Sequence, residues 1–188
     1  MRHLSVFNNV SLDGYFSGPG GDFRWAHEDG DDLEYREFVA SNASGGGVLV
    51  FGRVTYELMA GWWPTPAAAQ TDPVVARQMN ALPKIVFSRT LGRVEWENTT
   101  LLRGDAATEM RRLKGEPGAD MVVLGSGRIV VALAKEGLVD EFQVLVNPVA
   151  LGKGRTIFEG LEKPLRVALS ESRAFANGKV FIRYRSVP

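Results

Sequence analysis

Two hydrophobic periodicities alternate along the chain. Residues 3–10 alternate apolar and polar positions, as a half-buried strand does, and short apolar runs predict further strands at residues 48–51, 84–87, 99–102 and 121–124. Between these runs, apolar residues recur at helical spacing. Strands that alternate with helices are typical of a parallel sheet, so this part of the chain predicts an α/β class protein.

The C-terminal part follows a different pattern. Residues 141–149 form a long strand interrupted by Pro148, and residues 165–175 and 179–185 flank Ala176-Asn177-Gly178. An Asn-Gly pair between two strand-like runs is a strong hairpin signal. We therefore predict a mixed, mostly parallel sheet that ends in an antiparallel hairpin.

Polar residues and prolines mark the predicted helix starts. Asp31 is followed three residues later by Glu34, which is a capping-box pattern. Pro73 suits the first turn of a helix, and Asp105 can cap a helix that runs through Leu113. Residues 114–119 form a Gly/Pro turn that we expect to be a flexible connector.

Composition narrows the class of protein. The 188 residues suit one domain over residues 1–188, and 22 basic against 22 acidic residues leave no surplus for nucleic acid or a membrane surface. No apolar run approaches a membrane span or a signal peptide, so we expect a cytoplasmic protein. The chain has no cysteine and 2 histidines, which argues against a metal site or a catalytic triad.

A glycine turn between a strand and a helix is the most informative motif. Gly125-Ser126-Gly127 follows the apolar run 121–124, and backbone N–H groups at a helix start can bind phosphate. The turn lacks the third glycine of a dinucleotide fingerprint, since Val130 stands there, and it comes late in the chain. A close-packed turn and a phosphate site are equally compatible with this motif.

Two further strand ends carry phosphate-binding residue types. Gly52, Arg53 and Thr55 follow one strand, and Ser88-Arg89-Thr90 follow another. Each motif alone is more often a capped helix or a solvated arginine. The carboxyl ends of parallel strands share one sheet edge, however, and open α/β sheets bind ligands there. Arg53 and Arg89 suit an extra phosphate, which favours NADPH over NADH.

Candidate residues for catalysis and substrate binding lie in loops. Asp13 either forms a local turn or lies beside the reacting end of the cofactor, and the Gly-rich run to Gly21 could be a lid. The basic turn Gly152-Lys153-Gly154 is not a Walker A motif; it either holds a substrate phosphate or is solvated. Trp25 is either a core residue or a surface on which a flat ring stacks.

The ordered set of these motifs resembles a known family. Ser11-Leu12-Asp13-Gly14-Tyr15, Gly52-Arg53-Val54-Thr55-Tyr56-Glu57, Phe87-Ser88-Arg89-Thr90, Gly125-Ser126-Gly127 and Asn147-Pro148 before Gly152-x-Gly154 occur in one order. They resemble the reductase domain of the riboflavin-biosynthesis bifunctional deaminase/reductase and its stand-alone relatives in the dihydrofolate reductase superfamily. The zinc motif of the deaminase half is absent.

The resemblance implies a fold, a cofactor and roles for residues. It implies a dihydrofolate reductase-like, three-layer fold of about eight strands with helices on both faces, commonly as a homodimer. It implies NADPH, with Gly52, Arg53 and Thr55 at phosphates, Ser88, Arg89 and Thr90 around the adenosine and its 2′-phosphate, Gly125, Ser126, Gly127, Arg128 and Ile129 at the pyrophosphate, and Val10, Leu12 and Asp13 near the nicotinamide.

Three functional hypotheses follow. The leading hypothesis is an NADPH-dependent reductase of a small heterocyclic substrate, similar to 5-amino-6-(5-phosphoribosylamino)uracil reductase. The proton would come from water or from Asp13, and Trp25 and residues 152–154 would contact the substrate. A second hypothesis is a dihydrofolate or pterin reductase, in which Asp31, Asp32 or Glu34 would supply the carboxylate. A third is a nucleotide-binding protein without turnover.

Overall fold

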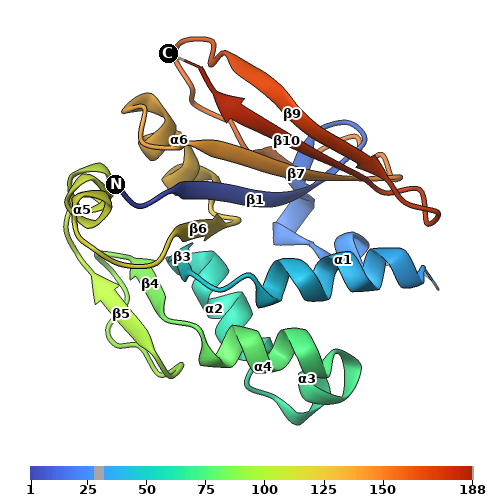
Figure 1. Cartoon of the computed structure of the whole chain (residues 1–188), viewed down its shortest axis with the longest axis horizontal. Coiled ribbons are helices and arrows are strands. Elements are labelled where there is room, and N and C mark those ends of the chain that lie inside the picture. The colour runs from blue at the N-terminus through green and yellow to red at the C-terminus, as the bar shows by residue number, and fades with distance from the viewer. Residues whose placement is uncertain (28–31, 188) are drawn as a thin grey trace.

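The predicted strands assemble into one eight-stranded sheet in the computed structural model, which describes residues 1–27 and 32–187 (Figure 1). Across the sheet, the strands lie in the order β5 (Thr99–Leu102), β4 (Lys84–Phe87), β3 (Val48–Gly52), β6 (Met121–Leu124), β1 (Leu4–Ser11), β7 (Glu141–Asn147), β10 (Val180–Ser186) and β9 (Val167–Ala174). Pairing is parallel from β5 to β7, and β10 is antiparallel to both of its neighbours. The predicted parallel sheet and antiparallel hairpin are therefore confirmed.

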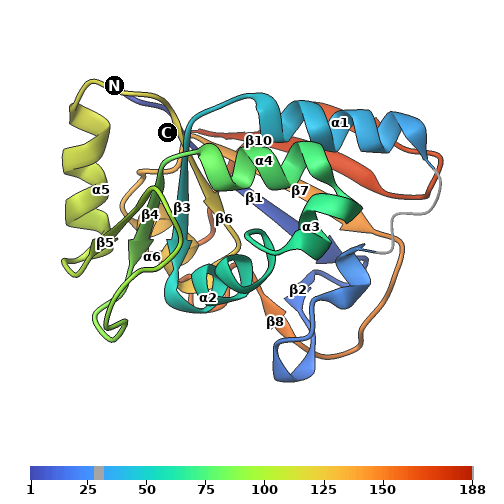
Figure 2. The ribbon, with the colours of Figure 1, turned by 90° about the horizontal axis from the view of Figure 1, so that it is seen from below.

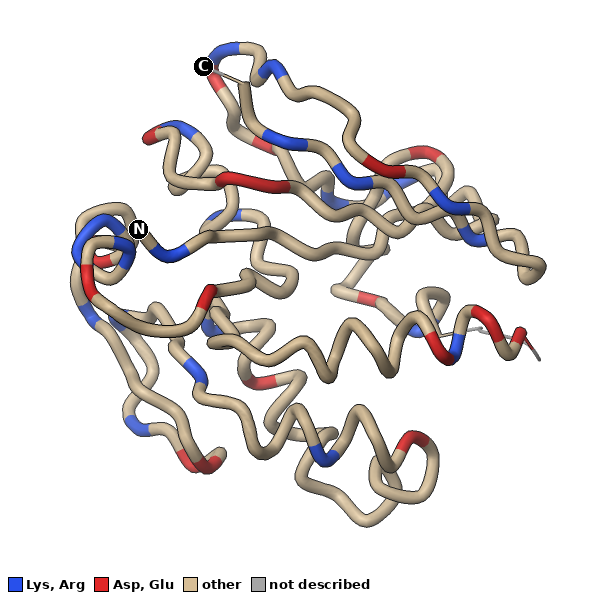
Figure 3. Tube along the Cα trace, viewed as in Figure 1, with Lys and Arg blue, Asp and Glu red and all other residues tan. Residues whose placement is uncertain are grey.

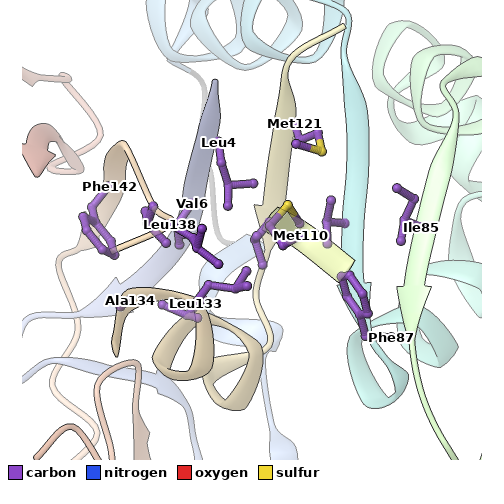
Figure 4. Packing of buried hydrophobic residues seen from close by; sticks show 14 of the residues in the cluster. Leu4, Val6, Ile85, Phe87, Met110, Met121, Leu133, Ala134, Leu138 and Phe142 are labelled. Atoms are coloured by element: carbon purple, nitrogen blue, oxygen red, sulfur yellow. The ribbon is translucent and has the colours of Figure 1, made fainter. Parts of the chain in front are cut away.

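Helices cover both faces of this sheet. Helices α5 (Ala106–Gly115) and α6 (Gly127–Lys135) pack on one face, where Met110 and Leu133 meet Leu4 and Val6 of β1 (Figure 4). Helices α1 (Leu33–Ser44), α2 (Arg53–Trp62), α3 (Pro66–Thr71) and α4 (Pro73–Ala81) lie on the other. The result is the predicted three-layer arrangement.

Strand β1 contributes to both layers because successive side chains of a strand point to opposite faces. Leu4, Val6 and Val10 join the core beneath α5 and α6, whereas Phe7 packs with the cluster that includes Tyr35 of α1. Asn9 shares the face of Phe7. One strand thus presents side chains to both layers at the centre of the sheet.

A small second sheet lies at the carboxyl end of the parallel strands. Strand β2 (Tyr15–Ser17) pairs antiparallel with β8 (Arg155–Thr156), and Figure 2 shows both near the end of the sheet at which α2 lies. An added Cβ at Gly154 would lie 2.2 Å from the Ser17 carbonyl oxygen, so this close pairing requires glycine. The sequence predicted only a loop here and missed this element and the 3₁₀ helices Pro19–Gly21 and Arg24–His27.

Two local predictions need correction, and one helix was not predicted. Asp32 caps α1 by accepting a hydrogen bond from the Tyr35 N–H (3.0 Å), whereas the predicted cap, Asp31, lies outside the described residues. Helix α3 was not predicted. Lys114 was predicted in a flexible connector, but its ammonium group is buried, donates to the Leu138 carbonyl (2.8 Å) and pairs with Asp140.

Charges of both signs are interspersed over the described chain (Figure 3). The basic residues of α5 illustrate this, because Arg111 pairs with Glu136 (2.9 Å) and Arg112 with Glu109 (3.0 Å). In residues 1–27 and 32–187, the helices all fall short of the length and apolar character that crossing a membrane would require.

Candidate functional site

The strands at the centre of the sheet end at different heights. Strand β1 pairs with β6 only from Leu4 to Phe7, whereas it pairs with β7 from Ser5 to Ser11. The last residues of β1 therefore extend past the end of β6 and border an open space. The Gly125 N–H closes the β6 ladder by donating to the Phe7 carbonyl (3.3 Å).

This space lies where the connections between neighbouring parallel strands begin to run in opposite directions across the sheet. Strand β3 continues into α2 and then to β4 on one side, whereas β6 continues into α6 and then to β7 on the other. Helices α2 and α6 belong to opposite layers. A crevice at such a switch point is the usual ligand site of an open α/β sheet.

A cavity of about 750 Å³ occupies the crevice, which is the size of a small-molecule site. Its walls are largely apolar, with Tyr35 and Val39 from α1, Met59 from α2 and Met79 from α4. The polar side chains that line it are Asn8, Asn9, Ser17, His27, Arg53, Thr55, Asp72, Ser126, Arg128 and Arg155.

Two helices begin at the cavity without a side-chain cap. The N-cap residues of α2 and α6 are Gly52, which has no side chain, and Ser126, whose side chain does not bond to α6. Ser126 adopts a left-handed conformation (φ 61°), and its hydroxyl accepts from the Gly52 N–H (2.7 Å) and donates to Thr55 Oγ1 (2.9 Å). The hydroxyl thereby ties the two helix ends together and leaves their first N–H groups to a ligand.

The glycines of this turn keep the backbone bare. Gly125 has a φ of 61°, and an added Cβ would lie 3.1 Å from Thr55 Oγ1. A Cβ at Gly127 would lie 3.1 Å from the Phe16 ring and 3.4 Å from the Ile157 carbonyl oxygen. The positive ends of two helix dipoles and an uncovered backbone make this end of the cavity suitable for a phosphate group.

Three arginines add positive charge to the cavity. Arg53 pairs with Glu57 (2.8 Å) and Arg155 with Glu159 (3.3 Å). No ion pair of Arg128 is found within the described residues. Among the described residues, Asp72 is the one carboxylate that lines the cavity. It accepts a hydrogen bond from the Val75 N–H and caps α4. The cavity therefore favours an anionic ligand.

The residues predicted around the adenosine lie beside the cavity. Phe87 lines it, but Ser88, Arg89 and Thr90 follow outside, where the Ser88 hydroxyl accepts from the N–H groups of Thr90 (3.2 Å) and Leu91 (2.9 Å). Arg103 supports the same loop by donating to the Gly92 carbonyl (2.9 Å). Sequence reasoning missed Arg103, although it too directly follows a strand.

The residues predicted near the nicotinamide do not line the cavity. Val10 is buried in the core, and Leu12 is 72% exposed. Asp13 is a structural clamp: its carboxylate accepts from the Ser11 hydroxyl (2.6 Å) and from the N–H groups of Leu151 (3.0 Å) and Gly152 (2.6 Å). These hydrogen bonds, that of Ser11 above all, lower the pKa of Asp13 to about 2. Asp13 is ionised at neutral pH, so the geometry does not support it as a proton donor.

The residues predicted to contact substrate are also displaced from the cavity. Trp25 is buried, and its indole N–H donates to the Asp22 carbonyl (3.1 Å). Its edge-on neighbour Phe23 lines the cavity in its place. Gly152, Lys153 and Gly154 form the loop that Asp13 holds, and Arg155, the next residue, lines the cavity.

In contrast, the fold brings together most of the residues that were predicted to contact the phosphates of the cofactor. Gly52, Arg53, Thr55, Gly125, Ser126, Gly127, Arg128 and Ile129 all line one cavity. Sequence reasoning missed Asn9, Tyr35, Met59 and Arg155. Apolar helix positions carry no signal that separates a cavity wall from a core, and Asn9 is one of several polar residues in a strand that alternates apolar and polar positions.

The sheet order and the crevice at the strand ends define the class of the protein as a dihydrofolate reductase-like α/β fold. Comparison with known proteins gives the family: residues 2–181 match the model of the RibD C-terminal domain, and the chain belongs to that family. Both the expected fold and the family resemblance are therefore confirmed.

Two relatives match almost the whole chain. The chain is 26% identical to the uncharacterized protein YyaP of Bacillus subtilis over 97% of this chain and 94% of that protein. It is 28% identical to the uncharacterized protein YwjB of the same organism over 93% and 92%.

Among solved structures, a putative riboflavin biosynthesis protein from Shewanella sp. PV-4 has a TM-score of 0.75 at 22% identity and covers 99% of both chains. A diaminohydroxyphosphoribosylaminopyrimidine deaminase/5-amino-6-(5-phosphoribosylamino)uracil reductase from Thermotoga maritima has a TM-score of 0.66 at 13% identity, over 99% of this chain and 57% of that longer one. Family and fold together support a RibD-type reductase.

Proposed function

We propose that the protein is an NADPH-dependent reductase that transfers hydride to a small heterocyclic substrate, similar to 5-amino-6-(5-phosphoribosylamino)uracil reductase. One observation carries the proposal: the uncapped starts of α2 and α6 meet at the cavity and are joined through the Ser126 hydroxyl. An extended dinucleotide needs such a phosphate site next to an apolar compartment. The apolar wall formed by Tyr35, Val39 and Met79 supplies that compartment.

The cofactor would be held mainly by backbone. The pyrophosphate would meet residues 125–129, and Gly52, Arg53 and Thr55 would contact the phosphates on the α2 side. Ser88, Arg89 and Thr90 would flank the adenosine and its 2′-phosphate from the loop beside the cavity. When bound, NADPH supplies the hydride. The contribution of this chain is to bind, to orient and to exclude water.

The proton source follows from the state of Asp13. Its carboxylate is ionised and occupied by the loop of Leu151 and Gly152. We therefore assign the proton to water that enters the cavity with the substrate. Asp13 instead holds the loop that leads to Arg155.

The pterin hypothesis receives less support. Asp32 caps α1 and also accepts from the Asn177 N–H (2.9 Å), and Glu34 pairs with Arg173 (2.6 Å). Both carboxylates are thus engaged away from the cavity, and Asp31 lies outside the described residues. A pterin ring would lack the carboxylate that its amino edge requires.

A thermal-shift titration with NADPH and NADH tests the proposal. A ligand at 100 times its Kd stabilises the folded state by about 2.7 kcal/mol, so NADPH should raise the Tm clearly and NADH less. Arg89→Ala should weaken NADPH about tenfold and leave NADH unchanged, because one charge-assisted hydrogen bond to the 2′-phosphate is lost. Arg93→Ala is the matched control, since that side chain is 84% exposed in the same loop.

Absence of a shift with either nucleotide would contradict the proposal. Turnover is tested by adding the riboflavin precursor or dihydrofolate and following NADPH absorbance; binding without turnover of either would favour a nucleotide sensor. Formation of a homodimer stays a prediction, which light scattering of the purified protein would test.

A further inference from the structure

Three asparagines gather where β1 and β7 end at the cavity. Asn9 and Asn147 lie on the sheet face that α1 covers, since Asn9 pairs with Leu145 and Ser11 with Asn147 in the strand register. Asn8 precedes Asn9 on β1 and, as its neighbour in a strand, points to the opposite face of the sheet. Asn9 lines the cavity, whereas Asn147 is 1% exposed and lies behind it.

Asn147 fixes the orientation of Asn9. The Asn147 Nδ2 lies 3.2 Å from Asn9 Oδ1, 3.2 Å from the Val10 carbonyl and 3.1 Å from the Leu145 carbonyl. Backbone acceptors on two strands thus hold the Asn147 amide. Because Asn9 Oδ1 faces this donor, the Asn9 Nδ2 is the group turned to the cavity, where it can donate to a ligand.

Part of the hydrogen-bonding capacity of these asparagines is unused within the described chain. Asn8 Nδ2 and Asn147 Oδ1 are both buried without a hydrogen-bond partner among residues 1–27 and 32–187. Buried polar atoms without partners destabilise a fold, so apolar side chains would suit these positions better. Their presence next to the cavity favours a role in recognition.

We propose that Asn9, oriented by Asn147, determines substrate specificity by donating a hydrogen bond to a ring carbonyl. The inference rests on the proposed function and narrows its substrate class to uncharged, planar rings with a carbonyl edge. Tyr35, Val39 and Leu145 supply the apolar walls for such a ring. An amino edge would need an acceptor, and the carboxylate of Asp72 is already engaged by Val75.

Two fluorescent probes of nearly equal shape test this inference. Lumazine carries two ring carbonyls where 2,4-diaminopteridine carries two amino groups. In Asn9→Asp, a carboxylate oxygen replaces the donor, so lumazine should bind at least tenfold more weakly, while 2,4-diaminopteridine can turn an amino group to the carboxylate. The ratio of the 2,4-diaminopteridine Kd to the lumazine Kd should therefore fall at least tenfold. Asn42→Asp adds the same charge on the exposed face of α1 and should leave the ratio unchanged.

The positioning role of Asn147 is tested separately. Asn147→Asp keeps the shape but removes the donor that fixes Asn9, so the preference for lumazine should disappear. A purely structural role would lower the Tm and leave the ratio as it is. Should Asn147→Asp fail to fold, the Asn9→Asp ratio still decides the proposal.

Three results would overturn the proposal: an unchanged ratio in Asn9→Asp, no binding of either probe, or a loss of NADPH affinity in Asn9→Asp with the ratio intact. The last result would assign the amide to the cofactor. All titrations are run with and without NADP⁺. If the protein discriminates between the two probes but neither NADPH nor NADH raises its Tm, the proposed function is contradicted, whereas the role of Asn9 in recognising a ring carbonyl is supported.

Discussion

The helices of the described chain begin in two different ways. Side chains cap α1, α3, α4 and α5, through Asp32, Thr65, Asp72 and Asp105. Helices α2 and α6 directly follow β3 and β6 at the crevice, and their N-cap side chains make no such bond. Ser126 could cap α6, but its hydroxyl bonds to Gly52 and Thr55 instead. Side-chain caps therefore stabilise the helices away from the crevice. At the crevice such caps are absent, and a ligand can accept hydrogen bonds from the free backbone N–H groups.

Removal of the Ser126 hydroxyl should produce the largest effect. In Ser126→Ala the Gly52 N–H loses its acceptor, and we expect a loss of about 1–3 kcal/mol in the free energy of unfolding. The untied helix ends should also weaken NADPH at least tenfold. Denaturant unfolding and a NADPH titration measure the two effects, with Ser41→Ala on the exposed face of α1 as the control. Unchanged NADPH affinity would show that the tie between the helices is not part of the site.

Removal of a true cap should affect stability alone. Thr65 Oγ1 accepts from the Ala68 N–H (3.2 Å) at the start of α3. Thr65→Ala should lower the free energy of unfolding by about 1 kcal/mol, as loss of an N-cap does, with NADPH affinity unchanged. If NADPH binding weakened as much as in Ser126→Ala, the distinction between the two kinds of helix start would fail.

The Asp13 clamp should contribute stability with a defined pH dependence. Its pKa falls from 3.8 to about 2 in the folded protein, mainly through the Ser11 hydroxyl, so the folded state favours the ionised form. This contribution is complete above pH 3.8 and is lost as the pH falls through about 2. The stability difference between wild type and Asp13→Asn, measured by denaturant unfolding, should therefore vanish towards pH 2. A difference that stays constant with pH would rule out the ionised clamp.

The smallest effect is expected at Asn8 and has the opposite sign. Asn8→Leu removes a buried amide nitrogen without a partner in the described chain and keeps the branched shape of the side chain, so the free energy of unfolding should rise by up to about 1 kcal/mol. Calorimetry of the ligand-free protein measures this change. A clear decrease would indicate that Asn8 stabilises the strand and would weaken the case that the amides at the crevice serve recognition.

Local patterns were sufficient for most of the fold. Residues 84–87 and 121–124 were predicted as strands with the bounds that the structure has, because apolar runs between turn residues are a local signal. The phosphate side of the site was also predictable, since glycines and hydroxyls at strand ends share one sheet edge. Helix α3 was missed because the helix that begins at the start signal of Thr65-Pro66 has only six residues, which show no hydrophobic periodicity.

The parts of the fold and of the site that could not be predicted depend on contacts between residues far apart in the sequence. Asp13 meets Leu151 and Gly152 across a separation of more than 130 residues, so no local pattern could distinguish a clamp from a catalytic carboxylate. Strand β8 has two residues and exists because β2 lies beside it. Tyr35 and Val39 occupy apolar helix positions that look alike whether they face a core or a cavity.

The central place of β1 has a consequence for how the protein is made. Strand β1 pairs with β6 and β7, which follow much later in the sequence, and its first β6 contact, between Leu4 and Met121, spans 117 residues. Pairings between such distant segments slow folding, because the loop between them must close first. During synthesis, Leu4 and Val6 therefore have no neighbouring strand until β6 and β7 have emerged, and chaperones that bind short apolar segments can bind β1 during that time.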